Sequence, residues 1–284
     1  MIEFKPRIWT LMGVSAMALV GAAACQPGGE GGTAAADGEK ATSSAAAGEG
    51  EGEGAKVAPA PASASAGGES GEAGAANAYS NVEPASWLGL RVTHLSGFLL
   101  VAQKSFAAGQ VEEASVLISQ GLLEVYQPDA AELDSKIKEL KPAYDAVVAA
   151  IDGKKSNVEI EAAFAKALKV TAAAQTSAAA PDADVIKGML GIASGLYSGV
   201  VHPNGNDPTE YQHAYGALLA AEQAFKSAQS RLASKDEKRT TQLAKDMAAL
   251  SALFPSVTIP DAPAATAAVT AAASRAELAL SGIR

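Results

Sequence analysis

From Tyr79 to the end of the chain, apolar residues recur at the spacing of an α-helix. Between Leu88 and Phe106 they follow one another at intervals of three or four positions, which places them on one helix face. The segments 133–151 and 243–254 show the same stripe. Strict alternation of apolar and polar residues, which is typical of β-strands, does not occur over a convincing length. The pattern therefore predicts an all-α domain.

Capping residues indicate where several of these helices begin. Ser156 and Glu159 have the spacing of a capping box, and Asp207 and Glu210 repeat that spacing with Asp in place of Ser or Thr. Pro142 is expected to kink the helix that contains it. The expected helices cover roughly 85–107, 110–126, 130–151, 157–178, 183–200, 208–233, 236–253 and 263–281. About eight helices of this kind predict an irregular antiparallel bundle.

The segment 26–78 has a different composition, dominated by Gly, Ala, Ser, Pro and Glu. Val57 is its one large aliphatic residue, and it contains eight acidic residues against Lys40 and Lys56. Such a segment cannot bury enough apolar surface to offset the entropy lost on ordering. We therefore expect residues 25–78 to be a disordered tether and residues 79–284 to be the folded domain.

The first 24 residues have the pattern of a secretory signal. Lys5 and Arg7 precede an uncharged apolar run, 8–24, which is shorter than the roughly 20 residues that a membrane span needs. The residues Ala22-Ala23-Ala24-Cys25 resemble the lipobox of bacterial lipoproteins. That resemblance implies cleavage before Cys25, acylation of Cys25 and attachment to a membrane through its acyl chains. Because Gln26 follows the cysteine, it also implies the outer membrane, with the helical domain facing the periplasm.

Charge and composition exclude several other functions. The net charge of −9 makes nucleic acid an unsuitable partner. Cys25 is the only cysteine, so no disulfide can form within the chain and no thiol remains for catalysis. With three histidines and no nucleophile motif, the chain offers little material for acid–base or nucleophilic catalysis. We therefore expect a protein that is not an enzyme and that has no cofactor.

The stretch "HPNGNDPTEYQHAYG", residues 202–216, is the strongest candidate for a metal site. Glu210 and His213 share a helix face, and His202 lies just before that helix. With His94 from an earlier helix, these residues could hold one divalent metal ion. Alternatively, Asp207 and Glu210 only cap the helix, and the histidines need no ligand. We favour capping, because it explains the same residues with fewer assumptions.

Glycines recur every four residues in the segment 183–200, at Gly191, Gly195 and Gly199. Glycine lowers helix propensity by about 1 kcal/mol relative to alanine, so a compensating contact is expected. A second helix packed closely on this groove is the simpler interpretation, because small residues permit close approach. A ligand or a partner protein in the groove is the alternative.

Three motifs carry a further resemblance: "HLSGFLLVAQKSFAAGQVEEA", "EVYQP" and "EYQHAYG". They are similar to uncharacterised helical periplasmic proteins of Gram-negative bacteria, some of which are associated with iron permeases. The sequence therefore favours a membrane-anchored periplasmic lipoprotein that binds an unknown periplasmic protein partner or acts as a scaffold. The alternative is a metal-binding accessory protein of a transport system, taking iron, copper or zinc.

Overall fold

The computed structural model describes residues 70–283 and confirms the all-α class. The predicted signal peptide, Cys25 and the tether through residue 69 lie outside the described residues. The elements in chain order are α1 (Ser70–Ser80), η1 (Pro84–Ser86), α2 (Trp87–Ala107), α3 (Val111–Gly121), η2 (Leu122–Tyr126), η3 (Gln127–Asp129), α4 (Ala130–Lys136), α5 (Leu140–Asp152), α6 (Asn157–Ala178), α7 (Asp182–Tyr197), β1 (Val201–His202), β2 (Gly205–Asn206), α8 (Pro208–Lys235), α9 (Glu237–Ser251) and α10 (Thr266–Ser281).

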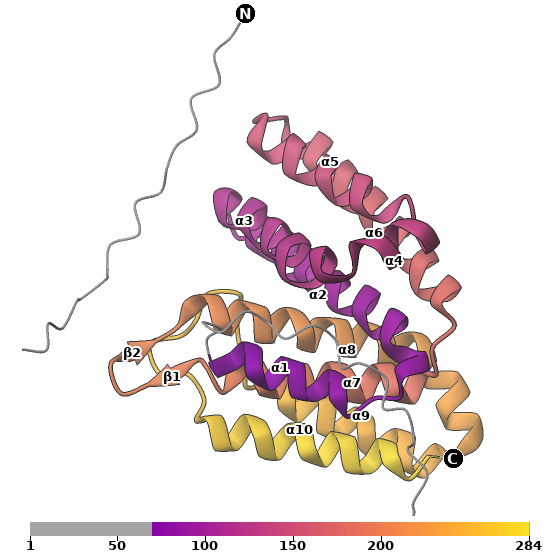
Figure 1. Ribbon diagram of the computed structural model, residues 1–284. Coiled ribbons are helices and arrows are strands. Elements are labelled where there is room, and N and C mark those ends of the chain that lie inside the picture. Colours follow the sequence, from indigo (N-terminus) through magenta and orange to yellow (C-terminus); the bar gives the residue numbers. More distant parts are fainter. Residues whose placement is uncertain (1–69, 284) are drawn as a thin grey trace, which may run out of the picture. The chain divides into compact units, whose positions relative to one another are not determined.

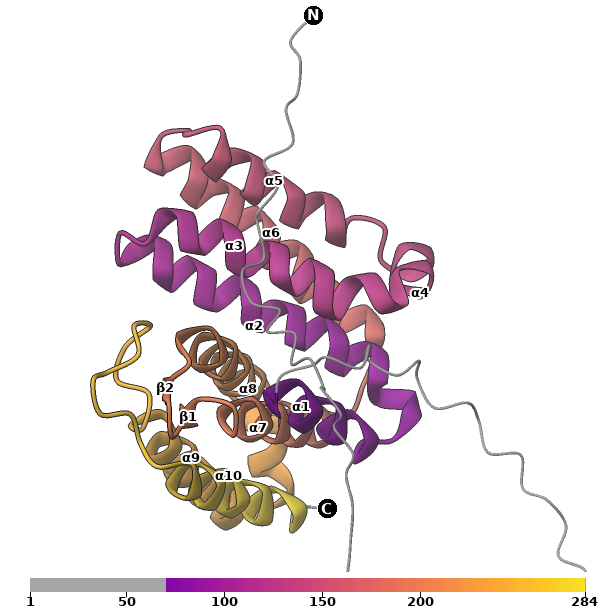
Figure 2. The same ribbon diagram turned by 60° about the vertical axis from the view of Figure 1, so that its left-hand side comes forward.

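The long helices form two groups of four. In the first four-helix group, α2, α3, α5 and α6 pack in a ring, each against two neighbours. In the second four-helix group, α7, α8, α9 and α10 form a similar ring. Figures 1 and 2 show the two groups on opposite sides of the α2–α8 contact. The outer helices α3, α5, α6, α9 and α10 have a solvent side, so their sequences carry an apolar stripe and a polar face.

The two groups are joined through the helix α2. It packs against α3 and α6 of its own group and also against α8 and α7 of the other. The segment Pro84–Ala107 is long and apolar enough to cross a membrane. However, 72% of its most apolar 18-residue stretch is buried inside the protein. Its apolar character is therefore explained by its central place in the core, since a helix that is apolar all round is buried.

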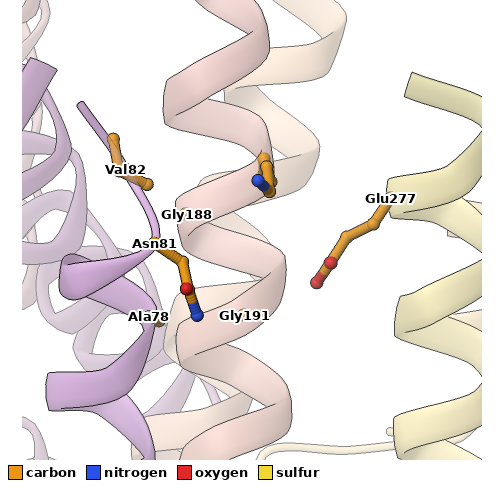
Figure 3. A pocket seen from close by; sticks show the side chains of 7 residues that line it. Ala78, Asn81, Val82, Gly188, Gly191 and Glu277 are labelled. Carbon is orange, nitrogen blue, oxygen red and sulfur yellow. The ribbon is translucent and has the colours of Figure 1, made fainter. Parts of the chain in front are cut away.

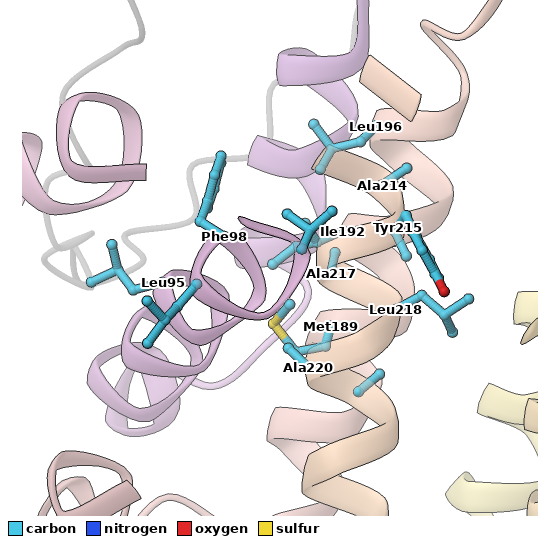
Figure 4. Packing of buried hydrophobic residues seen from close by; sticks show 14 of the residues in the cluster. Leu95, Phe98, Met189, Ile192, Leu196, Ala214, Tyr215, Ala217, Leu218 and Ala220 are labelled. Carbon is cyan, nitrogen blue, oxygen red and sulfur yellow. The ribbon is translucent and has the colours of Figure 1, made fainter. Parts of the chain in front are cut away.

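An aromatic cluster closes one end of the second four-helix group. The ring of Tyr211 lies 5.5 Å from that of Phe254 and 6.3 Å from that of Tyr197, measured between centroids. The Tyr211 hydroxyl donates to the carbonyl of Ser256 at 2.9 Å, and the Tyr197 hydroxyl donates to the carbonyl of Ala264 at 2.9 Å. Burial raises the pKa of Tyr211 to about 12. These bonds tie the irregular segment between α9 and α10 to the helices, and Figure 4 shows part of the adjoining core.

One predicted helix is divided in the structure. The expected helix over 130–151 is two helices, α4 and α5, because the backbone leaves the helical region at Ile137, with φ −140° and ψ 63°. The expected kink at Pro142 was wrong. Pro142 lies in the first turn of α5, where its missing N–H would have had no helical partner.

The helix starts agree with the capping pattern at two positions. Ser156 and Glu159 form a complete capping box at the start of α6. The Asp207 carboxylate accepts hydrogen bonds from the backbone N–H groups of Thr209 and Glu210, at 2.8 and 3.0 Å. Before α8, the strands β1 and β2, of two residues each, pair as an antiparallel hairpin that the sequence pattern did not predict.

The helical part of the chain begins at Ser70, nine positions before the predicted domain boundary. The helix α1 has no large aliphatic residue, so it carries no apolar stripe that periodicity could detect. It packs instead on α7 through small residues. Close backbone contact explains why a segment with a tether-like composition is ordered here.

Candidate functional site

The predicted glycine groove of α7 is filled by the chain's own helix α1. A Cβ atom added at Gly195 would lie 2.6 Å from the carbonyl oxygen of Gly74, and one added at Gly191 would lie 3.1 Å from the Cβ of Ala78. Gly199 does not belong to the groove, because α7 ends at Tyr197 and Gly199 lies in the following turn. The groove therefore serves helix packing within the chain, as the simpler interpretation predicted.

Replacing Gly195 by leucine is expected to release α1 from α7. The added side chain would overlap the α1 backbone, and overpacking of this kind costs about 1–3 kcal/mol. Hydrogen exchange of the α1 amides should then accelerate strongly. Ala172→Leu is the control, since Ala172 is exposed on α6. Unchanged protection of α1 in Gly195→Leu would contradict the packing described here.

A small pocket lies beside the N-terminal part of α7, between α1 and α10 (Figure 3). Its volume is about 280 Å³, just below the range of about 300–1,000 Å³ that is usual for small-molecule sites. Glu277 enters it from α10, and Lys187 lies on α7. No ion pair joins these two side chains in the part of the chain that the structure describes. The lining residues are Ala78, Asn81, Val82, Lys187, Gly188, Gly191 and Glu277.

The carboxyl group of Glu277 is expected to destabilise the fold slightly at neutral pH. Burial raises its pKa, and the nearby Lys187 ammonium offsets only part of that shift. Because the folded state disfavours the ionised form, the cost appears as the pH rises above the usual value of 4.5. Glu277→Gln should therefore raise the free energy of unfolding at pH 7 by up to about 1 kcal/mol. Urea unfolding tests this, with the exposed Glu161→Gln as control; a destabilised Glu277→Gln protein would contradict it.

Two of the predicted site histidines lie together in the core, where α2 crosses α8. The ring of Phe98 is 5.4 Å from the ring of His94 and 4.9 Å from that of His213, measured between centroids. Both histidines are buried, with 5% and 7% of their surface exposed. The Tyr79 hydroxyl lies 3.0 Å from Nδ1 of His94, so α1 also contributes to this cluster.

His213 is contacted by the last turn of α3 and by the segment that follows it. Its Nε2 lies 3.2 Å from Oε1 of Gln120, and because an amide oxygen only accepts, Nε2 donates in this bond. Its Nδ1 lies 3.8 Å from a carboxylate oxygen of Glu124. Glu124 belongs to η2, a single turn of π-helix that continues α3. Turns of this kind occur frequently at functional sites, because they redirect side chains.

Both buried histidines are neutral at neutral pH. Burial lowers the pKa of His94 to about 3, assisted by the nearby His213 and Arg91. Burial also lowers the pKa of His213 to about 4, against an opposing effect of Asp207. A neutral imidazole can donate one hydrogen bond and accept one. His94 pairs with Tyr79 through Nδ1, and His213 pairs with Gln120 through Nε2. Nε2 of His94 is buried without a hydrogen-bond partner among the described residues, so the cluster is only partly satisfied.

The predicted metal-ligand set is not assembled among the described residues. His202 is exposed in the β hairpin, whereas His94, Glu210 and His213 are buried. No group of three or more His, Cys, Asp or Glu side chains in residues 70–283 is arranged to hold a metal ion. The capping interpretation of Asp207 is confirmed by its two hydrogen bonds.

Sequence reasoning missed three members of the histidine cluster: Tyr79, Gln120 and Glu124. Glu124 reaches His213 through a π-helical turn, and the apolar pattern around it is that of a continuous helix. Gln120 lies on a half-exposed helix face that offers no reason to select it. Tyr79 belongs to α1, which has no apolar stripe. The His-x-x-Gly spacing at His94 and His213 gave no signal either, because the exposed His202 has the same spacing to Gly205.

Comparison with known proteins gives one match. Residues 171–283 match the family model of the iron permease-associated 4-helix bundle domain. This range covers less than half of the chain and includes all four helices of the second four-helix group. No curated protein and no solved structure matches the chain. The second four-helix group is therefore similar to a helical domain that is associated with iron permeases.

Proposed function

We propose that this chain is a non-enzymatic accessory component of an iron-permease system. The match of residues 171–283 to an iron permease-associated domain carries the proposal. The helical module binds a protein partner of that system rather than transforming a substrate. The buried histidines support a binding or structural role, because burial keeps both neutral and both pack on the ring of Phe98.

In this proposal the module is held at a membrane by acyl chains on Cys25. The resemblance of residues 22–25 to a lipobox supports the anchor, and Gln26 supports the outer membrane with the module facing the periplasm. Residues 26–69 then connect the lipid to α1. Radiolabelled palmitate should be incorporated into the full chain and not into Cys25→Ala. Equal labelling of both proteins would rule out this anchor.

Iron uptake tests the transport role directly. A deletion strain complemented with the full chain should accumulate radioactive iron faster at low iron supply than the uncomplemented strain. Complementation with Cys25→Ala separates anchoring from the module's own activity. Crosslinking of the complemented strain, followed by detection of the iron permease with its own antibody, tests physical association. Unchanged uptake together with no crosslinked permease would overturn the proposal.

A metal-binding accessory protein is the second candidate, and the same family match favours iron as its metal. Titration of the mature chain with iron, copper and zinc tests this candidate by calorimetry. One-to-one binding that is lost in His213→Ala would support it. Binding that survives His213→Ala would assign the metal elsewhere, and the absence of binding would leave protein recognition as the module's role.

A further inference from the structure

The helices α2 and α8 carry the same sequence motif. Residues 94–106 read HLSGFLLVAQKSF, and residues 213–225 read HAYGALLAAEQAF. Six of the thirteen positions are identical at a constant offset of 119. The shared residues are His94 and His213, Gly97 and Gly216, Leu99 and Leu218, Leu100 and Leu219, Ala102 and Ala221, and Phe106 and Phe225.

The environments of the two helices match as well as their sequences. Leu100 and Leu219 are both half-buried, in each case with buried residues on either side. Lys104 and Gln223, at equivalent positions, are both exposed. Each helix also belongs to a ring of four: α2 lies between α3 and α6, and α8 lies between α7 and α9. The neighbours differ in chain order, since α3 and α6 both follow α2 whereas α7 precedes α8, so the equivalence lies in the burial of the motif positions.

The two motifs meet at their equivalent glycines. A Cβ atom on Gly97 would lie 2.7 Å from the carbonyl oxygen of Gly216, and a Cβ atom on Gly216 would lie 2.8 Å from the carbonyl oxygen of Gly97. A contact in which each residue touches its own equivalent is the signature of a twofold, self-complementary interface. The crossing of α2 and α8 therefore has the geometry of a homodimer contact within one chain.

We propose that the chain is a fused pseudo-dimer, in which Gly97 and Gly216 each mark the centre of a self-complementary helix-pairing face. The partner that this face fits is a second copy of the same face. Within one chain the face on α2 and the face on α8 cover each other. If one face is disabled, the other becomes free to pair with its counterpart on a second chain. This inference does not depend on the proposed role in iron transport.

One difference between the two motifs favours the α2–α8 pair over a pair of two identical helices. Phe98 on α2 corresponds to Ala217 on α8, and the Phe98 ring packs on both His94 and His213. A pair of two α8 helices would lack this ring and leave space beside the histidines, whereas a pair of two α2 helices would contain it twice. Homotypic pairs should therefore be weaker than the α2–α8 pair, because lost packing contacts are not replaced.

Leucine substitutions in the mature chain without its lipid, residues 26–284, test the pairing face. Gly97→Leu blocks the face on α2, and Gly216→Leu blocks the face on α8, since leucine cannot fit at either backbone contact. Each single variant should show twice the parent's mass by light scattering. The double variant should return to the parent's mass, because no intact face remains. Ser230→Leu, on an exposed part of α8, is the control and should keep the parent's mass.

Single variants that keep their helical circular dichroism but stay at the parent's mass would overturn the proposal. A double variant that also doubles its mass would overturn it too, because association would then not need the face. If the leucine variants lose helical structure, Gly97→Ala and Gly216→Ala decide, because a Cβ atom alone already lies too close to the facing carbonyl oxygen. A doubled mass for each single alanine variant supports the proposal. Folded alanine variants that keep the parent's mass overturn it.

Discussion

Lowering the pH from 7 to 5 is expected to reduce the free energy of unfolding by about 4 kcal/mol through His94 and His213. In the unfolded chain both imidazoles take up a proton below their usual pKa of 6.5. In the folded protein their pKa values are about 3 and about 4, so both stay neutral at pH 5. Each contributes about 2 kcal/mol of this loss, at 1.36 kcal/mol per pH unit. The stabilisation is complete above pH 6.5 and is lost as the pH falls.

The charges around the two histidines compensate only part of this loss: Asp207 favours protonation of His213, but burial still lowers the pKa of His213 to about 4. Arg91 opposes protonation of His94, and the carboxylate of Glu124 lies 3.8 Å from His213, too far for a strong hydrogen bond. Urea unfolding at several pH values measures the effect. The double variant His94→Gln/His213→Gln should lose about 4 kcal/mol less between pH 7 and pH 5, and the exposed His202→Gln should behave like the parent. Equal losses in the double variant and the parent would assign the acid sensitivity to other groups.

Replacing Tyr211 by alanine is expected to lower the free energy of unfolding by about 3–5 kcal/mol. Tyr211 is fully buried and its ring contacts Tyr197, Tyr215 and Phe254. Removal of the ring leaves a cavity at the end of the second four-helix group, where the surrounding helices cannot close without moving. Urea unfolding followed by circular dichroism measures the change.

The variant Tyr211→Phe separates the ring from its hydroxyl. It removes only the hydrogen bond to the carbonyl of Ser256, so it should cost about 1 kcal/mol. Hydrogen exchange should then increase in the segment around Ser256 and Val257 while the helices keep their protection. If the alanine and phenylalanine variants lost equal stability, the ring contacts would not be the main contribution of Tyr211.

Most of the helices could be predicted from the sequence, because each has apolar residues at helical spacing on one face and polar residues on the other. The segment 157–178 was predicted to the residue, since Ser156 and Glu159 form a complete capping box and the apolar stripe is regular. The break at Ile137 could not be predicted, because no glycine or proline stands at that position. The helix α1 was missed because its packing depends on Gly74 and Gly195 rather than on large apolar residues. Close backbone contact leaves no periodic signal in one sequence.

The candidate sites were less predictable than the fold. The glycine spacing in α7 indicated close packing, but only the structure shows that α1 supplies the packed backbone. The capping role of Asp207 followed from local spacing and needed no tertiary information. By contrast, the approach of His94 to His213 depends on how two helices cross. The crossing is set by Gly97 and Gly216, which are far apart in the chain.

The two glycine contacts also have a consequence for how the chain folds. Contacts within each four-helix ring join helices that are close in sequence, whereas Gly74 meets Gly195 and Gly97 meets Gly216 across most of the domain. Contacts of high sequence separation form late, because a long loop must close first. Each ring should therefore collapse early, with its glycine surface still open to solvent. A slow, concentration-sensitive docking phase is the expected result, in which pairing between two unfinished chains competes with pairing inside one.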